Sequence, residues 1–134
     1  MQIVQQVNVA MPNVPSSLAK VGDRLRAEDL NIDAISCTET PPVIHLIVDD
    51  PETAKIVLKD LGTVTITPVI AFTVKNKPGV IASIGRACAA IGVNIRLIYA
   101  TTFGKDAMVY MLVDDAQNVM EKLKTWEKSA GKLS

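Results

Sequence analysis

The sequence predicts an α+β protein built from two consecutive βαββαβ repeats, each an antiparallel sheet with its helices on one face. Alternating apolar runs, helical apolar periodicities and turn residues follow one another in the same order in both halves of the 134-residue chain. Eight residues of the first half also recur in the second half at a constant offset of 63 positions. The matched pairs are Asn13/Asn76, Pro15/Pro78, Gly22/Gly85, Ala27/Ala90, Asn31/Asn94, Ile32/Ile95, Ile35/Ile98 and Thr38/Thr101.

The first repeat, residues 1–67, is predicted to contain four strands and two helices. Its predicted strands cover residues 2–10, 30–38, 43–48 and 63–67, where β-branched and apolar residues concentrate. Ser16 and Ser17 are candidate N-caps of the first helix, and Asp50 begins the second helix as its cap. Gly62 is expected to end that second helix.

The second repeat, residues 68–134, is predicted to repeat this order after Pro68 separates the two halves. Its predicted elements are strands at 69–74, 93–101 and 108–113, a helix at 80–91, a hairpin turn at 103–106 and a helix from Ala116. Residues 127–134 are short and polar, which does not favour a strand. The second sheet is therefore expected either to lack its last strand or to borrow one from elsewhere.

A hairpin inside each repeat excludes an all-parallel sheet, so the element order predicts the ferredoxin-like arrangement. The third strand of each repeat is apolar on both sides, and we expect a second copy of the chain to cover the open sheet face as a homodimer. The helix at 80–91 is apolar around most of its circumference and is expected to be buried on more than one side. Gly22 and Gly85 lie inside helices, where glycine costs ~1 kcal/mol, and close approach of another backbone would offset that cost.

The composition indicates a globular chain and excludes several partners. Hydrophobic residues make up 49% of the chain, and 14 Lys and Arg balance 14 Asp and Glu, so neither nucleic acid nor a membrane surface is an expected partner. No apolar run approaches a membrane span and no signal peptide is evident, which predicts a cytoplasmic protein. Cys37 and Cys88 are expected to be buried, reduced thiols.

Catalysis and metal binding find no support in the sequence. The chain has one histidine, no Gly-x-Ser-x-Gly motif and no phosphate-binding glycine-rich loop, so we expect no catalytic residues, no metal and no cofactor. His45 corresponds to Tyr110 in the second repeat, which favours a packing role over a chemical one. The acidic pairs Asp49-Asp50 and Asp114-Asp115 each precede a helix, which favours helix capping over cation binding.

The segment Asn76-Lys77-Pro78-Gly79-Val80, followed by Val93-Asn94-Ile95, resembles an ACT domain, a small ligand-binding module of amino-acid metabolism. The first repeat resembles a weaker copy, and together the two cover nearly the whole chain. The resemblance implies a free-standing tandem ACT protein with modules at 1–67 and 68–134. It further implies binding of a small molecule, typically an amino acid, between modules, and regulation of a partner enzyme.

The resemblance implies that ligand contacts come from the loop before the first helix and from the start of the second strand. The matching positions are Asn76, Lys77, Pro78, Gly79, Val80, Asn94 and Ile95 in the second repeat, and Asn13, Val14, Pro15, Ser16, Ser17, Asn31 and Ile32 in the first. Free N–H groups at a helix N-terminus suit a carboxylate, and asparagine and backbone carbonyls suit an ammonium. Glycine permits positive φ whereas serine favours capping, so the loop with Gly79 is the expected better site and the loop with Ser16 the weaker one.

Two interpretations remain open at this point. Asn-x-Pro-Gly is also a favourable turn sequence, so the loop residues have a purely structural explanation as well. The sequence favours a non-catalytic regulatory protein that senses a metabolite. The alternative is an interaction subunit that docks an enzyme through its apolar sheet face and binds no ligand of its own.

Overall fold

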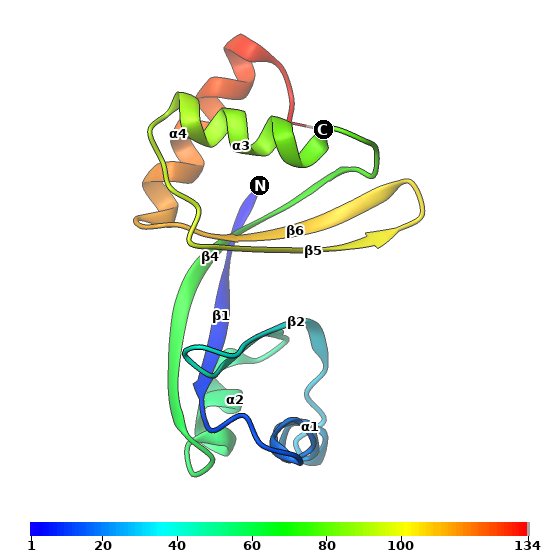
Figure 1. Ribbon diagram of the computed structural model, residues 1–134, viewed down its shortest axis with the longest axis vertical. Helices are drawn as coiled ribbons and strands as arrows, with labels where there is room; N and C mark the ends of the chain where they lie inside the picture. The colour runs from blue at the N-terminus through cyan, green and yellow to red at the C-terminus, as the bar shows by residue number, and fades with distance from the viewer. Residues whose placement is uncertain (134) are drawn as a thin grey trace. The chain divides into compact units, whose positions relative to one another are not determined.

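The computed structural model describes residues 1–133 and divides the chain into two compact units (Figure 1). The first unit comprises residues 5–67, and the second comprises residues 1–4 together with the chain from Pro68 onward. Each unit has its own apolar core, because two separate clusters of buried side chains are present. The chain therefore begins in the second unit, passes through the first and returns to the second.

The first unit contains a four-stranded sheet in the order β2-β3-β1-β4, with two helices on one face (Figure 1). Its elements are β1 (Gln2–Ala10), α1 (Ser17–Ala27), β2 (Ile32–Thr38), β3 (Val43–Val48), α2 (Pro51–Leu58) and the first part of β4 (Thr63–Lys75). The β1/β3 and β2/β3 pairs are antiparallel. The fully buried side chains Val7, Val21, Leu25, Leu46 and Leu58 join the sheet to both helices.

The second unit uses strands in the order β1-β4-β6-β5, and α3 and α4 lie on one face of that sheet (Figure 1). Its further elements are α3 (Val80–Ala90), β5 (Leu97–Phe103), β6 (Asp106–Leu112) and α4 (Ala116–Ala130). The β4/β6 and β5/β6 pairs are antiparallel. Both units therefore have the ferredoxin-like arrangement that the element order predicts.

The second unit borrows its fourth strand from the start of the chain. Residues 127–130 belong to α4, and residues 131–133 form no strand; residue 134 lies outside the described residues. Strand β1 is instead a hydrogen-bonded neighbour of β4, and Met1 and Ile3 pack partly buried against the core of the second unit. This resolves the two possibilities left by the sequence in favour of a borrowed strand.

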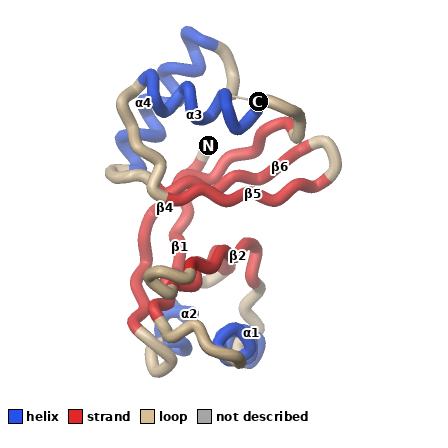
Figure 2. Tube along the Cα trace, in the orientation of Figure 1, coloured by secondary structure: helices blue, strands red, loops and turns tan. Residues whose placement is uncertain are grey.

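The prediction that Pro68 separates two strands is wrong. Strand β4 runs without interruption from Thr63 to Lys75, and its two parts belong to different units (Figure 2). Proline fixes φ near an extended value and removes a single N–H donor, so a strand can pass through it where that donor is not needed. Pro68 is exposed, which is consistent with a position outside both cores.

The second strand of each repeat begins later than predicted. Strand β5 starts at Leu97 and β2 at Ile32, so Val93, Asn94 and Ile95 precede the strand. The N–H of Val93 donates to the carbonyl oxygen of Cys88 at 2.9 Å, which continues the C-terminal turn of α3. The local apolar pattern of these residues reflects packing against the core rather than sheet pairing.

Helix α3 is buried on one side within the chain, which differs from the expectation of burial on more than one side. Ile84, Ala87 and Cys88 are buried, whereas Ile81 is 56% exposed. A Cβ added at Gly22 or Gly85 would meet no atom within 4 Å. No other segment among residues 1–133 therefore packs closely against either glycine, and both positions are open on their helices.

The sheet face of the first unit that points away from its helices is more polar than its third strand predicted. Val7 and Val9 face the helices, so the alternating residues Gln6 and Asn8 lie on the opposite face. The side chain of Asn8 accepts from Gln6 Nε2 at 2.7 Å and donates to Thr67 Oγ1 at 2.9 Å, and its Oδ1 lies 3.0 Å from His45 Nδ1. The neighbouring strands thus supply a hydrogen-bond network around His45, whose pKa is lowered by burial.

Candidate functional site

The loops before α1 and α3 share one backbone conformation, although one contains serine and the other glycine. Ser16 has φ 79° and ψ −10°, and Gly79 has φ 92° and ψ −9°. The side chain of Ser16 makes no capping hydrogen bond, so the prediction that this serine caps the helix is wrong. Serine tolerates the left-handed conformation here at an energetic cost that glycine avoids.

The side chain of Ser17 holds the first loop through hydrogen bonds, although no side chain caps the N-terminus of α1. Its hydroxyl donates to the carbonyl oxygen of Pro12 at 2.8 Å and accepts from the N–H of Val14 at 3.3 Å. The N–H of Ser17 donates in turn to the carbonyl oxygen of Val14 at 3.1 Å. Ser17 is buried, so these bonds hold the loop as a compact turn above the end of β1.

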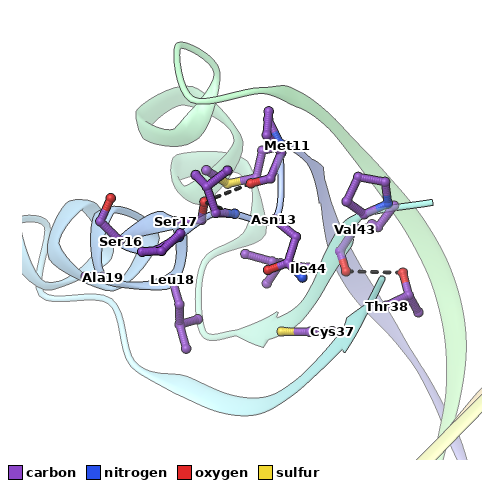
Figure 3. Close-up of a pocket in the computed structure, with 14 residues that line it drawn as sticks. Met11, Asn13, Ser16, Ser17, Leu18, Ala19, Cys37, Thr38, Val43 and Ile44 are labelled. Atoms are coloured by element: carbon purple, nitrogen blue, oxygen red, sulfur yellow. Dashed lines mark hydrogen bonds between the residues drawn. The ribbon is translucent and has the colours of Figure 1, made fainter. Parts of the chain in front are cut away.

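A cavity of about 350 Å³ opens beside this first loop, within the first unit (Figure 3). All five predicted loop positions line it, from Asn13 to Ser17. The remaining walls come from the end of β1, the first turn of α1, the end of β2 and the start of β3. These residues are Met11, Pro12, Leu18, Ala19, Cys37, Thr38, Pro42, Val43 and Ile44. The volume falls within the range of small-molecule pockets, about 300–1,000 Å³.

Several polar groups at this cavity have no partner among the described residues. The backbone N–H groups of Leu18 and Ala19, in the first turn of α1, donate no hydrogen bond to residues 1–133. The side chains of Asn13 and Ser16 likewise make none with that part of the chain. Thr38 differs, because its hydroxyl already donates to the carbonyl oxygen of Pro41 at 2.8 Å.

The second loop is fastened to its neighbouring hairpin instead. The N–H of Asn76 donates to the carbonyl oxygen of Lys105 at 2.8 Å, and Asn76 Nδ2 donates to that of Gly104 at 3.3 Å. Lys75 forms an ion pair with Asp106 at 3.2 Å on the adjoining strands. Asn13, the counterpart of Asn76, makes no such bonds to the first hairpin within the described residues. The geometry therefore favours the first loop as a site, although glycine favoured the second.

The other predicted residues of the second repeat lie along the surface of its unit. Lys77, Pro78 and Gly79 are exposed in the loop, and Val80 packs partly buried against the core. Asn94 is exposed, whereas Ile95 also packs against that core.

The strand-start residues of the first unit lie at the opposite end of α1 from the loop. Asn31 and Ile32 border a separate hollow of about 330 Å³ beside Gly22 and Arg26. The N–H of Asn31 donates to Asp49 Oδ1 at 3.1 Å, and Asn31 Nδ2 donates to Asp33 Oδ1 at 2.9 Å. Helix α1 has 11 residues, which corresponds to roughly 16 Å of length. Within this unit the structure brings the five loop residues together but not Asn31 and Ile32.

Sequence reasoning missed the part of the cavity that β2 and β3 supply. Cys37 is exposed rather than buried, so the prediction of a buried thiol is wrong at this position. Strand β2 lies at the edge of the sheet, where the helices cover it incompletely. Cys88 is buried as expected, and burial raises the pKa of its thiol. The one sequence feature that pointed to this part of the cavity was Thr38, which recurs as Thr101 in the second repeat.

The acidic pairs have different roles and form no metal site. Asp50 caps α2, because its carboxylate accepts from the N–H of Thr53 at 3.2 Å and from its hydroxyl at 2.7 Å, which lowers the pKa of Asp50. Asp115 precedes α4 with φ 54° and makes no capping bond, so that part of the capping prediction is wrong. Asp114 pairs with Arg96 at 3.1 Å. Residues 1–133 contain no group of His, Cys, Asp and Glu that could hold a metal ion.

The chain thus contains two ferredoxin-like units, each with an exposed loop before its first helix. The chain belongs to the ACT domain pair family, whose profile matches residues 1–127. ACT domains are regulatory rather than catalytic modules. None of the curated proteins compared with this chain matches it. No helix among residues 1–133 is long and apolar enough to cross a membrane.

Solved structures share the fold over nearly the full length. A crystal structure of protein BT0572 from Bacteroides thetaiotaomicron is 27% identical, covers 93% of this chain and 89% of its own, and has a TM-score of 0.85. The regulatory subunit of aspartate kinase from Thermus thermophilus, in a ligand-free form, is 17% identical with a TM-score of 0.67 and coverages of 93% and 97%. The corresponding subunit from Thermus flavus is 19% identical with a TM-score of 0.67 and coverages of 93% and 92%.

Proposed function

We propose that this ACT domain pair is a non-catalytic regulatory protein of the cytoplasm that binds a small molecule of the amino-acid class at the first loop. The observation that carries the proposal is the cavity beside that loop, because all five loop positions implied by the resemblance line it. Regulatory subunits of aspartate kinase share the fold, which supports a regulatory role beside a partner enzyme.

An α-amino acid fits the polar groups at the cavity. Its carboxylate can accept from the unpaired N–H groups of Leu18 and Ala19, where the dipole of α1 favours negative charge. Its ammonium can donate to the side-chain oxygen of Asn13. Binding would regulate the partner by differential affinity, since a ligand stabilises whichever conformation or assembly binds it more tightly.

A thermal-shift screen with the twenty amino acids tests this proposal. A ligand present at 100 times its Kd stabilises the folded state by about 2.7 kcal/mol, which is readily seen in the melting temperature. Leu18→Asp should abolish the shift, because it places a carboxylate in the cavity wall. Ile56→Asp is the matched control, since Ile56 is an exposed residue of α2 outside the cavity. Absence of a response to all twenty amino acids would refute the proposal.

We also propose that the protein self-associates through the exposed faces of α1 and α3. Leu18 and Ile81 occupy equivalent positions on these helices and are 53% and 56% exposed. Asp23 and Arg86, also equivalent and both exposed, follow the two open glycines and carry opposite charges. Packing α1 against α3 of a second copy would place unlike charges together, whereas α1 against α1 would place Asp23 against itself. Charge therefore favours the mixed pairing.

The alternative function is an interaction subunit that docks an enzyme without a ligand. Its docking surface would be the apolar sheet face expected from the sequence, since single exposed residues such as Ile56 and Phe103 form no patch by themselves. A protein of this type would show no thermal response to any amino acid. The screen above therefore separates the two functions.

A further inference from the structure

We infer that the ligand of the first-loop cavity carries an uncharged, apolar side chain. This inference rests on the proposed function and concerns the chemical class of the molecule bound. It follows from the chemical character of the residues that line the cavity.

None of the fourteen residues that line the cavity is charged. The wall outside the loop is formed by Leu18, which follows the loop in α1, by Cys37 and Thr38 from β2, and by Val43 and Ile44 from β3. Figure 3 shows Leu18 projecting from the first turn of α1 and the sulfur of Cys37 pointing toward it from the sheet. A side chain that enters between them meets methyl groups and a thiol.

The polar groups that have no partner among residues 1–133 lie on the loop side of the cavity. The free N–H groups and Asn13 lie at the loop and at the start of α1, where they can hold the carboxylate and ammonium common to all amino acids. The hydroxyls of Ser17 and Thr38 are already bonded to backbone carbonyls, at 2.8 Å in each case. A ligand oriented by the loop therefore directs its side chain toward the apolar wall.

A charged side chain in this position would lose part of its hydration without gaining an ion pair, because no lining residue is charged while Val14 and Leu18 remain 53% exposed. Burial of an unpaired charge is strongly unfavourable, whereas burial of methyl groups is favourable. Lysine, arginine, aspartate and glutamate should therefore bind more weakly than leucine, isoleucine, valine and methionine.

The second loop shows how one residue would change this preference. Its position equivalent to Val14 is Lys77, so a cation stands where the first loop has an apolar side chain. Val14 is 53% exposed, and a lysine can replace it without disturbing the core. Val14→Lys should therefore weaken binding of an apolar amino acid and favour an acidic one.

Calorimetric titration of the full chain with leucine, isoleucine, valine, methionine, lysine and aspartate tests the inference. We expect the tightest of the four apolar amino acids to bind at least about tenfold more tightly than lysine or aspartate, since a single methylene already changes affinity by about 10-fold to 200-fold. Val14→Lys should lower that affinity about tenfold, whereas Ile56→Lys, an equivalent change outside the cavity, should leave it within about twofold.

Alkylation of Cys37 locates the ligand without any substitution. Cys37 is exposed and Cys88 buried, so iodoacetamide should modify Cys37 alone in the folded protein. The folded Cys37→Ser variant should not be alkylated. The best apolar amino acid should slow this alkylation at least about fivefold at saturation. A bound apolar amino acid that leaves the rate unchanged would overturn the assignment to this cavity.

Two further outcomes separate the inference from the proposed function. Tightest binding of lysine or aspartate, with the same slowing of Cys37 alkylation, would overturn the apolar preference and leave the amino-acid site standing. Binding of none of the twenty amino acids would overturn both.

Discussion

Exchanging the residues at positions 16 and 79 tests whether the two loops share a backbone conformation. Ser16 and Gly79 have nearly the same dihedral angles, with φ of 79° and 92°. A non-glycine residue with left-handed φ costs about 1–2 kcal/mol, and glycine costs roughly 0.5–1 kcal/mol through the entropy of the unfolded chain. Ser16→Gly should therefore raise the free energy of unfolding by about 0.5–1 kcal/mol.

Gly79→Ser should lower it by a similar amount. A Cβ at Gly79 would meet no atom within 4 Å, so the effect isolates the backbone cost from any steric clash. For a chain of this size such changes correspond to melting-temperature shifts of roughly 2–4 °C in opposite directions, measured by scanning calorimetry.

Ser16→Ala is the control for this pair of substitutions. It keeps the Cβ and removes a hydroxyl that makes no capping hydrogen bond, so the melting temperature should change by less than about 1 °C. A loss of stability in both Ser16→Gly and Ser16→Ala would show that the hydroxyl caps α1 and would refute this reasoning.

Three further predictions concern His45 in the sheet, Gly62 before β4, and self-association through α1 and α3. Burial lowers the pKa of His45 below its unfolded value of about 6.5, so the unfolded state binds the proton more readily and stability is lost as pH falls through that range. The urea midpoint should therefore fall more between about pH 7.5 and about pH 5 in the wild type than in His45→Gln; equal falls would contradict the burial of this ring. Gly62→Ala would place a Cβ 2.3 Å from the carbonyl oxygen of Ala10, and the backbone shift required should cost at least about 2 kcal/mol in urea unfolding. Wild-type stability in this variant would show that the close approach is absent. For self-association, Asp23→Arg or Arg86→Asp alone should weaken the dimer about fivefold in analytical ultracentrifugation, and the double exchange should restore it; a monomeric wild type, or single exchanges without effect, would exclude the mixed pairing of helices.

The fold could be predicted from the sequence because its determinants are local. Apolar periodicity specified the four helices and the hairpins, and the constant offset between equivalent residues revealed the repeat. The resemblance to ACT domains also pointed to the loop Asn13 to Ser17, which lines the cavity, but it favoured the loop with Gly79. Errors arose where a local preference had to compete with packing, as at Ser16, where serine adopts the conformation of its glycine counterpart.

The tertiary structure decided what local patterns cannot encode. Strand β4 passes through Pro68, and residues 1–4 complete the sheet of the second unit, because sheet pairing joins segments that are distant in sequence. The cavity likewise needs Leu18 and Cys37 to face each other from a helix and a strand. The sequence by itself determined which elements form and in which order, through the periodicity of each segment. The uncharged cavity beside the first loop forms only when those elements pack, because its walls come from segments that are distant in sequence.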